Sequence, residues 1–284
     1  MSPWGGRAGP SLADFAPRPD LPARLASVEA ETAAHGLARS FELRVELPRG
    51  RGDAMILGYD GRDAAGRVVH AVRVATPLGV VMAVGPLDAG DLDRRTATEL
   101  VPALLGGGPK GEAPGAYRTG TDLNGDGRLD VVLRNEAGVI SIWHFDGLGS
   151  GAYEIEMEAS PTRASDLDGD GRIDLEGDLE IAPGDAIAPR FRDVATFDSG
   201  RYTNRSASAR AWHMRMARAA NAPAGAPDET RLRIALERSF HEVLAGARPV
   251  KNVLEDLRRE PVSTGLRSTF ERHVRVIAAL SHLR

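Results

Sequence analysis

Two nine-residue stretches place oxygen-bearing side chains at alternate positions. The first reads DLNGDGRLD over residues 122–130, and the second reads DLDGDGRID over residues 166–174. A hard divalent cation such as Ca²⁺ takes about six to eight oxygen ligands, which side chains at alternate positions of a tight turn can supply. Glycine at the sixth position permits the backbone angle that reverses the chain. Without a cation the acidic groups would repel one another, so each stretch predicts a calcium site.

Each predicted site uses the same five loop positions. The first, third and fifth positions supply side-chain oxygens, the seventh supplies its backbone carbonyl, and the ninth closes the shell directly or through water. The resulting ligands are Asp122, Asn124, Asp126, the Arg128 carbonyl and Asp130 in the first loop, and Asp166, Asp168, Asp170, the Arg172 carbonyl and Asp174 in the second. The competing interpretation is a turn rich in Asp, Asn and Gly that binds no ion.

The EF-hand interpretation fails for both loops. That motif needs a bidentate glutamate at the twelfth position, where the two loops carry Leu133 and Gly177. Apolar residues at 131–133 and 139–145, separated by a short turn, predict two strands after the first loop rather than an exiting helix.

A calcium loop followed by strands resembles the FG-GAP or VCBS-type repeat of integrin-like β-propeller blades and bacterial extracytoplasmic proteins. The resemblance covers residues 115–180, and the loops start 44 residues apart, which is compatible with one blade period. It implies two propeller-blade-like units, Ca²⁺ at both loops, and the ligands named above. Because a closed propeller needs at least about four blades, two units would leave an exposed edge that must be covered.

Composition narrows the class of protein. The 284-residue chain contains no cysteine, which excludes disulfides, thiolate metal sites and a cysteine nucleophile. No apolar run approaches the roughly 18 residues of a membrane span. The first residues lack the apolar core of a signal peptide, so either the protein is cytosolic or a leader is absent from this sequence. Loops of this kind suit extracellular calcium concentrations. We therefore expect an extracytoplasmic protein (periplasmic, cell-surface or secreted) whose leader is absent from this sequence.

Charge is distributed unevenly along the chain. Residues 117–200 carry seven basic and 18 acidic residues, a net charge of −11, whereas residues 201–284 carry 16 basic and eight acidic residues, a net charge of +8. We expect these two segments to attract each other. Acidic residues interrupt the arginines of the later helices, so nucleic-acid binding is not expected.

The elements around the loops predict an α+β fold. We expect an extended arm at 1–19, and a helix with antiparallel strands at 20–116. Two calcium-loop repeats follow at 117–200, and a bundle of about four helices at 201–284. Within the second segment, strands are predicted at 41–47, 54–59, 67–75 and 78–84, a short helix at 92–105, and a linker at 106–115.

The leading functional hypothesis is a calcium-stabilised binding or structural protein, with ions that are mainly structural and with a protein partner or self-association. No HExxH or GxSxG motif is present, so the sequence gives no catalytic constellation. One alternative is a hydrolase with structural calcium, whose active site would use residues such as His144, Asp146 and Glu154. Another is a subunit of a larger surface assembly.

Overall fold

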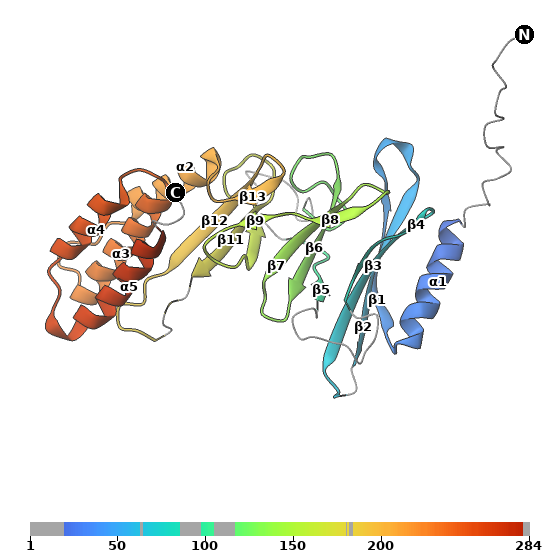
Figure 1. Cartoon of the computed structure of the whole chain (residues 1–284), viewed down its shortest axis with the longest axis horizontal. Helices are drawn as coiled ribbons and strands as arrows, with labels where there is room; N and C mark the ends of the chain where they lie inside the picture. The colour runs from blue at the N-terminus through green and yellow to red at the C-terminus, as the bar shows by residue number, and fades with distance from the viewer. Residues whose placement is uncertain are drawn as a thin grey trace, which may run out of the picture.

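The computed structural model describes residues 20–62, 65–85, 98–104, 117–179, 181 and 184–280. Within these ranges the chain forms three β-sheets, preceded by one α-helix and followed by four (Figure 1). The α+β class and the C-terminal helices predicted from sequence are confirmed. The expected arm at 1–19 and linker at 106–115 lie outside the described residues. None of the described helices has the length and apolar character that a membrane crossing requires.

The first two sheets are four-stranded antiparallel meanders. The first contains β1 (Ala38–Glu46), β2 (Asp53–Arg62), β3 (Val68–Thr76) and β4 (Gly79–Val84), in that order. The second contains β5 (Thr98–Leu100), β6 (Leu129–Asn135), β7 (Ile140–Phe145) and β8 (Ser150–Ala152). The predicted helix at 92–105 is therefore wrong over its described part, because β5 pairs with β6 there and Pro102 disfavours a helix.

The third sheet has five strands. It contains β10 (Arg163–Ser165), β11 (Asp174–Leu179), β12 (Phe191–Asp198) and β13 (Arg201–Thr203), with β9 (Ile155–Glu156) added in parallel beside β13. The division of the chain into domains at 20–116, 117–200 and 201–284 remains a prediction.

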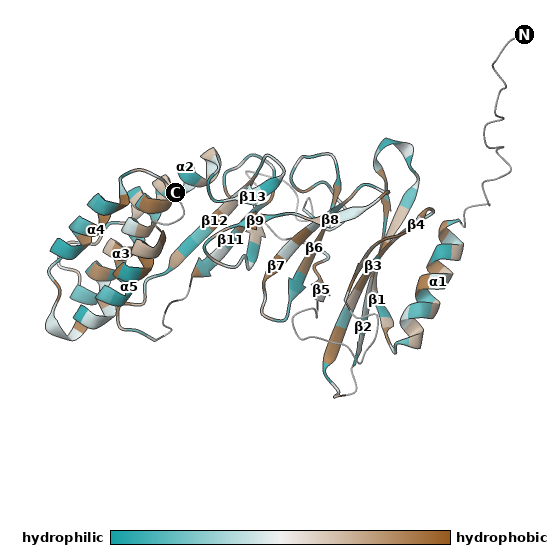
Figure 2. Ribbon diagram, in the orientation of Figure 1, coloured by the Kyte–Doolittle hydropathy of each residue, from teal (hydrophilic) through white to brown (hydrophobic). Residues whose placement is uncertain are grey.

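The central strands are buried on both faces, which explains their continuous apolar runs. In β2, Ile56 packs into the core shared with the second sheet, whereas Leu57 packs toward helix α1 (Leu21–Ala34). In β6, Val131 belongs to the core with the first sheet and Val132 to the core with the third. Successive side chains of a strand point to opposite faces. The three sheets therefore lie face to face in chain order, and Figure 2 shows the hydrophobic stretches along their strands.

Helices cover both ends of this stack (Figure 1). Helix α1 packs on the outer face of the first sheet, and its first turn is capped by Asp20, whose carboxylate accepts a hydrogen bond from the Ala23 backbone at 3.0 Å. At the other end lie α2 (Ala207–Ala219), α3 (Asp228–Leu244), α4 (Val250–Arg259) and α5 (Arg267–Ala279). Phe191 of β12 stacks on Phe240 of α3 with ring centroids 4.8 Å apart. The outward faces are thus buried without closure of the sheets into a ring.

Candidate metal centre at the two acidic loops

Both acidic loops lead into the second strand of their sheet. The loop at 122–130 runs into β6, and the loop at 166–174 joins β10 to β11. Gly127 and Gly171 adopt φ angles of 81° and 85°, the left-handed conformation expected at the sixth position. The first carboxylate of each loop accepts a hydrogen bond from this glycine, since Asp122 and Asp166 each receive the glycine N–H at 2.9 Å. The two loops therefore have the same local fold.

The second loop brings three carboxylates together. Asp166, Asp168 and Asp174 each place one oxygen so that the three oxygens lie within 4.8 Å of one another. Among the residues that the structure describes, these three aspartates form the one group of three or more possible metal-ligating side chains at such short distances. Burial raises the pKa of Asp174 to about 7, and repulsion from the neighbouring aspartates adds to the increase. The fifth-position residue, Asp170, is not part of this cluster and accepts a hydrogen bond from the Arg172 backbone at 2.8 Å.

The first loop contains a buried carboxylate with an open oxygen. Asp130 is fully buried, and its Oδ2 accepts a hydrogen bond from the Leu123 backbone at 2.8 Å. Its Oδ1 has no hydrogen-bond partner among the described residues. Burial raises the pKa of Asp130 to about 8, and repulsion from Asp126 and Asp122 contributes. A buried, unpartnered carboxylate oxygen beside further acidic groups fits a cation, because the cation would offset both burial and repulsion.

The side-chain oxygens of both loops are hard donors, the type that Ca²⁺ prefers. Asn124 is also buried, and its Oδ1 accepts the Asp126 backbone N–H at 3.1 Å. The side chains of Arg128 and Arg172 lie near His144 and Asp170 respectively, at 3.3 Å and 3.8 Å. Their carbonyl groups remain predicted ligands.

Tyrosines around the loops were not predicted from sequence. Tyr153 donates a hydrogen bond to Asp126 Oδ2 at 2.6 Å, and Tyr117 donates one to Asp166 Oδ2 at 3.4 Å. Tyr202 is fully buried in the same core. Because Tyr117 is 49 residues from Asp166 and Tyr153 is 27 residues from Asp126, only the folding of the second and third sheets brings these tyrosines to their carboxylates.

The two loops touch each other. The Ile173 N–H donates a hydrogen bond to the Leu123 carbonyl at 2.8 Å. The Arg172 side chain lies so close to Gly125 that a Cβ there would be 2.9 Å from its Nε. The two acidic loops therefore lie against each other between the second and third sheets.

The three residues named in the alternative hydrolase hypothesis each contact a different partner. His144 lies beside Arg128. Asp146 accepts a hydrogen bond from the Leu148 backbone at 2.9 Å, and Glu154 is exposed near Arg201. The described contacts do not link His144, Asp146 and Glu154 to one another by hydrogen bonds.

Comparison with known families identifies the segment that carries both loops. Residues 122–175 match the family model of the FG-GAP-like repeat. This segment of the chain is similar to the FG-GAP-like repeat. The match starts at Asp122 and ends at Leu175, so the FG-GAP-like segment contains the first loop, the strands β6 to β10, and the second loop. The resemblance inferred from the loops is thus confirmed. Comparisons with curated proteins and with solved structures give no match.

Proposed function

We propose that this protein is a calcium-stabilised binding or structural protein that works outside the cytoplasm. The observation that carries the proposal is the paired arrangement of the loops in the FG-GAP-like segment. One loop gathers three carboxylates, and the other buries an unpartnered carboxylate oxygen. FG-GAP-like repeats are typical of extracellular proteins that bind other proteins, which supports the location and a protein partner or self-association.

Two ions would be held by the residues predicted from the loop spacing. Asp122, Asn124, Asp126, Asp130 and the Arg128 carbonyl would bind one ion. Asp166, Asp168, Asp170, Asp174 and the Arg172 carbonyl would bind the other. When bound, Ca²⁺ supplies positive charge that offsets the repulsion among these carboxylates.

A structural role for the ions follows from where the loops lie. The carboxylates of Asp130 and Asp174 are buried at the beginning of β6 and β11, and both strands contribute to the core between the second and third sheets. Neutralising these carboxylates would therefore stabilise the packing of the two sheets. The surfaces left for a partner are the loops and strand edges of the stack.

Thermal unfolding in millimolar Ca²⁺ and in excess chelator tests the proposal. An ion that binds the folded state alone adds about 2.7 kcal/mol at a hundredfold excess over its dissociation constant. For a chain of this size, that corresponds to a rise in Tm of roughly 5 °C per site. The double variant Asp126→Ala with Asp170→Ala should lose the rise. The control Asp198→Asn alters an exposed aspartate outside the loops and should retain it. A Tm that is unchanged by chelator would refute the proposal.

A further inference from the structure

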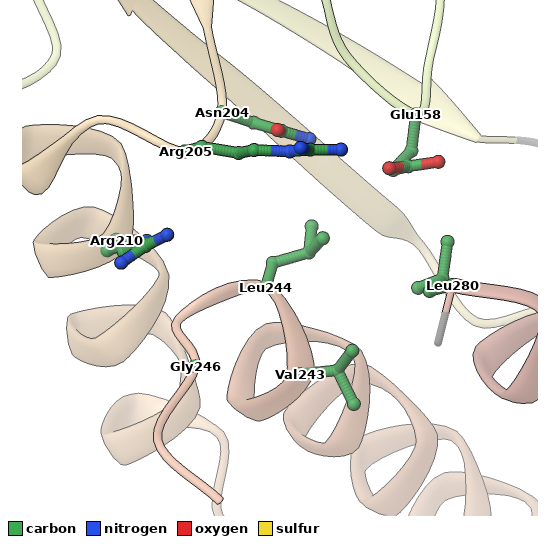
Figure 3. Close-up of a pocket in the computed structure, with 8 residues that line it drawn as sticks. All are labelled: Glu158, Asn204, Arg205, Arg210, Val243, Leu244, Gly246 and Leu280. Atoms are coloured by element: carbon green, nitrogen blue, oxygen red, sulfur yellow. The ribbon is translucent and has the colours of Figure 1, made fainter. Parts of the chain in front are cut away.

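A cavity of about 480 Å³ lies between the third sheet and the helical bundle (Figure 3). Its walls come from the segments around Glu158 and Asn204, the start of α2, and the ends of α3 and α5. None of its lining residues belongs to either acidic loop. The volume falls in the range of small-molecule sites, about 300–1,000 Å³.

One side of the cavity is apolar. Val243 and Leu244 come from the last turn of α3, and Leu280 follows α5. Figure 3 shows the Leu244 side chain directed into the space between Arg205 and Leu280. Such a surface favours an aliphatic group, because burying it removes apolar area from water.

The opposite side carries charged groups of both signs. Arg205 is already paired, since its Nε lies 3.1 Å from Glu156. Arg210 is exposed and Glu158 is half-buried, and neither forms an ion pair with another residue that the structure describes. Figure 3 shows Glu158 and Arg210 on different walls of the cavity. The Glu158 carboxylate is partly offset by the Arg205 charge and the Asn204 side chain, whereas Arg210 is a base that forms no ion pair with a described residue.

The polar wall is fixed from behind by a buried carboxylate. Asp193 is fully buried and accepts hydrogen bonds from the Glu158 backbone N–H at 2.6 Å and from Asn204 Nδ2 at 3.1 Å. Its other oxygen lies 3.2 Å from the buried His213 ring. These contacts hold the wall in place before any ligand arrives, which lowers the entropic cost of binding.

We propose that this cavity binds a small zwitterion with an aliphatic body, the chemical class of short apolar peptides, whose ammonium and carboxylate groups lie at opposite ends and can reach different walls. The ammonium group would pair with Glu158 and the carboxylate with Arg210, while the aliphatic part would pack on Val243, Leu244 and Leu280. A purely anionic ligand would face repulsion from Glu158, and a purely cationic one would face repulsion from Arg205 and Arg210. A zwitterion satisfies both walls.

The direct test is calorimetric titration of the full chain with dileucine and trileucine, and with L-leucine, which carries both charges on one carbon and should bind more weakly, as the comparison. At least one of the two peptides should bind saturably with one molecule per chain. For the tightest binder, acetylating the amino group or amidating the carboxylate should each weaken binding by about tenfold or more, because each change removes one charged contact. The proposal fails if neither peptide binds, or if either blocked form binds as tightly as the zwitterion.

Two variants assign the charges to residues. Glu158→Gln and Arg210→Gln should each weaken the tightest binder by about tenfold or more. The controls Glu154→Gln and Arg215→Gln change exposed residues outside the cavity and should leave the affinity unchanged. Glu158→Gln should have no comparable effect on the acetylated ligand, which has no ammonium group. Unchanged affinity in Glu158→Gln overturns the proposal, and the ligand series on the unaltered chain decides the question even if a variant does not fold.

Discussion

Tyr153 and Tyr202 provide a matched pair of substitutions at the acidic loops. Their rings lie in one buried cluster, with centroids 5.9 Å apart. Their hydroxyl groups differ, because that of Tyr153 donates to Asp126 at 2.6 Å whereas that of Tyr202 is buried without a hydrogen-bond partner among the described residues. The substitution Tyr153→Phe therefore removes a stabilising hydrogen bond, whereas Tyr202→Phe removes a buried hydroxyl that lowers stability.

The expected magnitudes follow from these contacts. Tyr153→Phe loses a hydrogen bond to a charged group, which costs about 1.5–3 kcal/mol. Asp126 keeps a hydrogen bond from the Arg128 backbone at 2.8 Å, so its carboxylate is not stripped of partners and we expect a loss of about 2 kcal/mol. Tyr202→Phe removes a buried polar group that makes no hydrogen bond, so we expect no loss and a gain of up to about 1 kcal/mol.

Urea unfolding in excess chelator measures both variants without a contribution from calcium. The prediction is that Tyr202→Phe is more stable than Tyr153→Phe by about 2–3 kcal/mol. If Tyr202→Phe loses as much stability as Tyr153→Phe, the Tyr202 hydroxyl has a partner, and the described arrangement of the loop side chains is wrong.

Two further predictions concern the third sheet and its contact with the helices. Gly177→Ala should lower the free energy of unfolding by about 1–3 kcal/mol or more, because a Cβ at this position would lie 2.2 Å from the Ser160 carbonyl oxygen. Gly149→Ala, which meets no atom within 4 Å, is the control in the same urea assay and should be nearly neutral. Burial, followed by the charges of His213 and Arg192, lowers the pKa of His241 from 6.5 to about 3, so its neutral form is favoured in the folded state. The free energy that neutral His241 contributes to folding is fully present above pH 6.5. It is lost as the pH falls toward 3, at up to about 1.4 kcal/mol per pH unit. Urea unfolding between pH 7 and pH 4 should therefore show a smaller decline for His241→Asn than for the unaltered chain, and equal declines would contradict this assignment.

The acidic loops could be predicted because their information is local. The spacing from Asp122 to Asp130 lies within nine residues, and the same spacing recurs from Asp166 to Asp174. The contact between the loops could not be predicted in this way. It depends on the packing of the second sheet on the third, which brings Ile173 to Leu123.

The strand β11 shows why the third sheet was harder to predict. Its sequence combines Glu176, Gly177 and Asp178, residues that are infrequent in strands. In the structure, Glu176 accepts a hydrogen bond from Arg163 at 2.6 Å, and Asp178 accepts one from Arg190 at 2.8 Å. The glycine allows the Ser160 backbone to approach closely. These partners lie outside β11 in the sequence, so the strand propensity of its own residues does not predict this strand.

The stacking of sheets is another tertiary feature. Two loop units predict that an edge must be covered, but they do not predict helices on both ends of a three-sheet stack. Continuous apolar runs in β2 and β6 are compatible with either a buried strand or a short buried helix. Only the folded chain shows that successive residues of each strand pack into two different hydrophobic cores.

The most direct test of the central claim is the number of Ca²⁺ ions bound per chain, measured by competition with a chromophoric chelator. We predict two ions for the unaltered chain. Asp130→Asn, which changes the buried carboxylate of the first loop, should bind one, and so should Asp168→Asn, which changes the cluster of the second loop. The double variant should bind none, and the exposed control Asp198→Asn should bind two. No bound calcium in the unaltered chain, or two ions still bound by the double variant, would contradict the proposal that these loops are calcium sites.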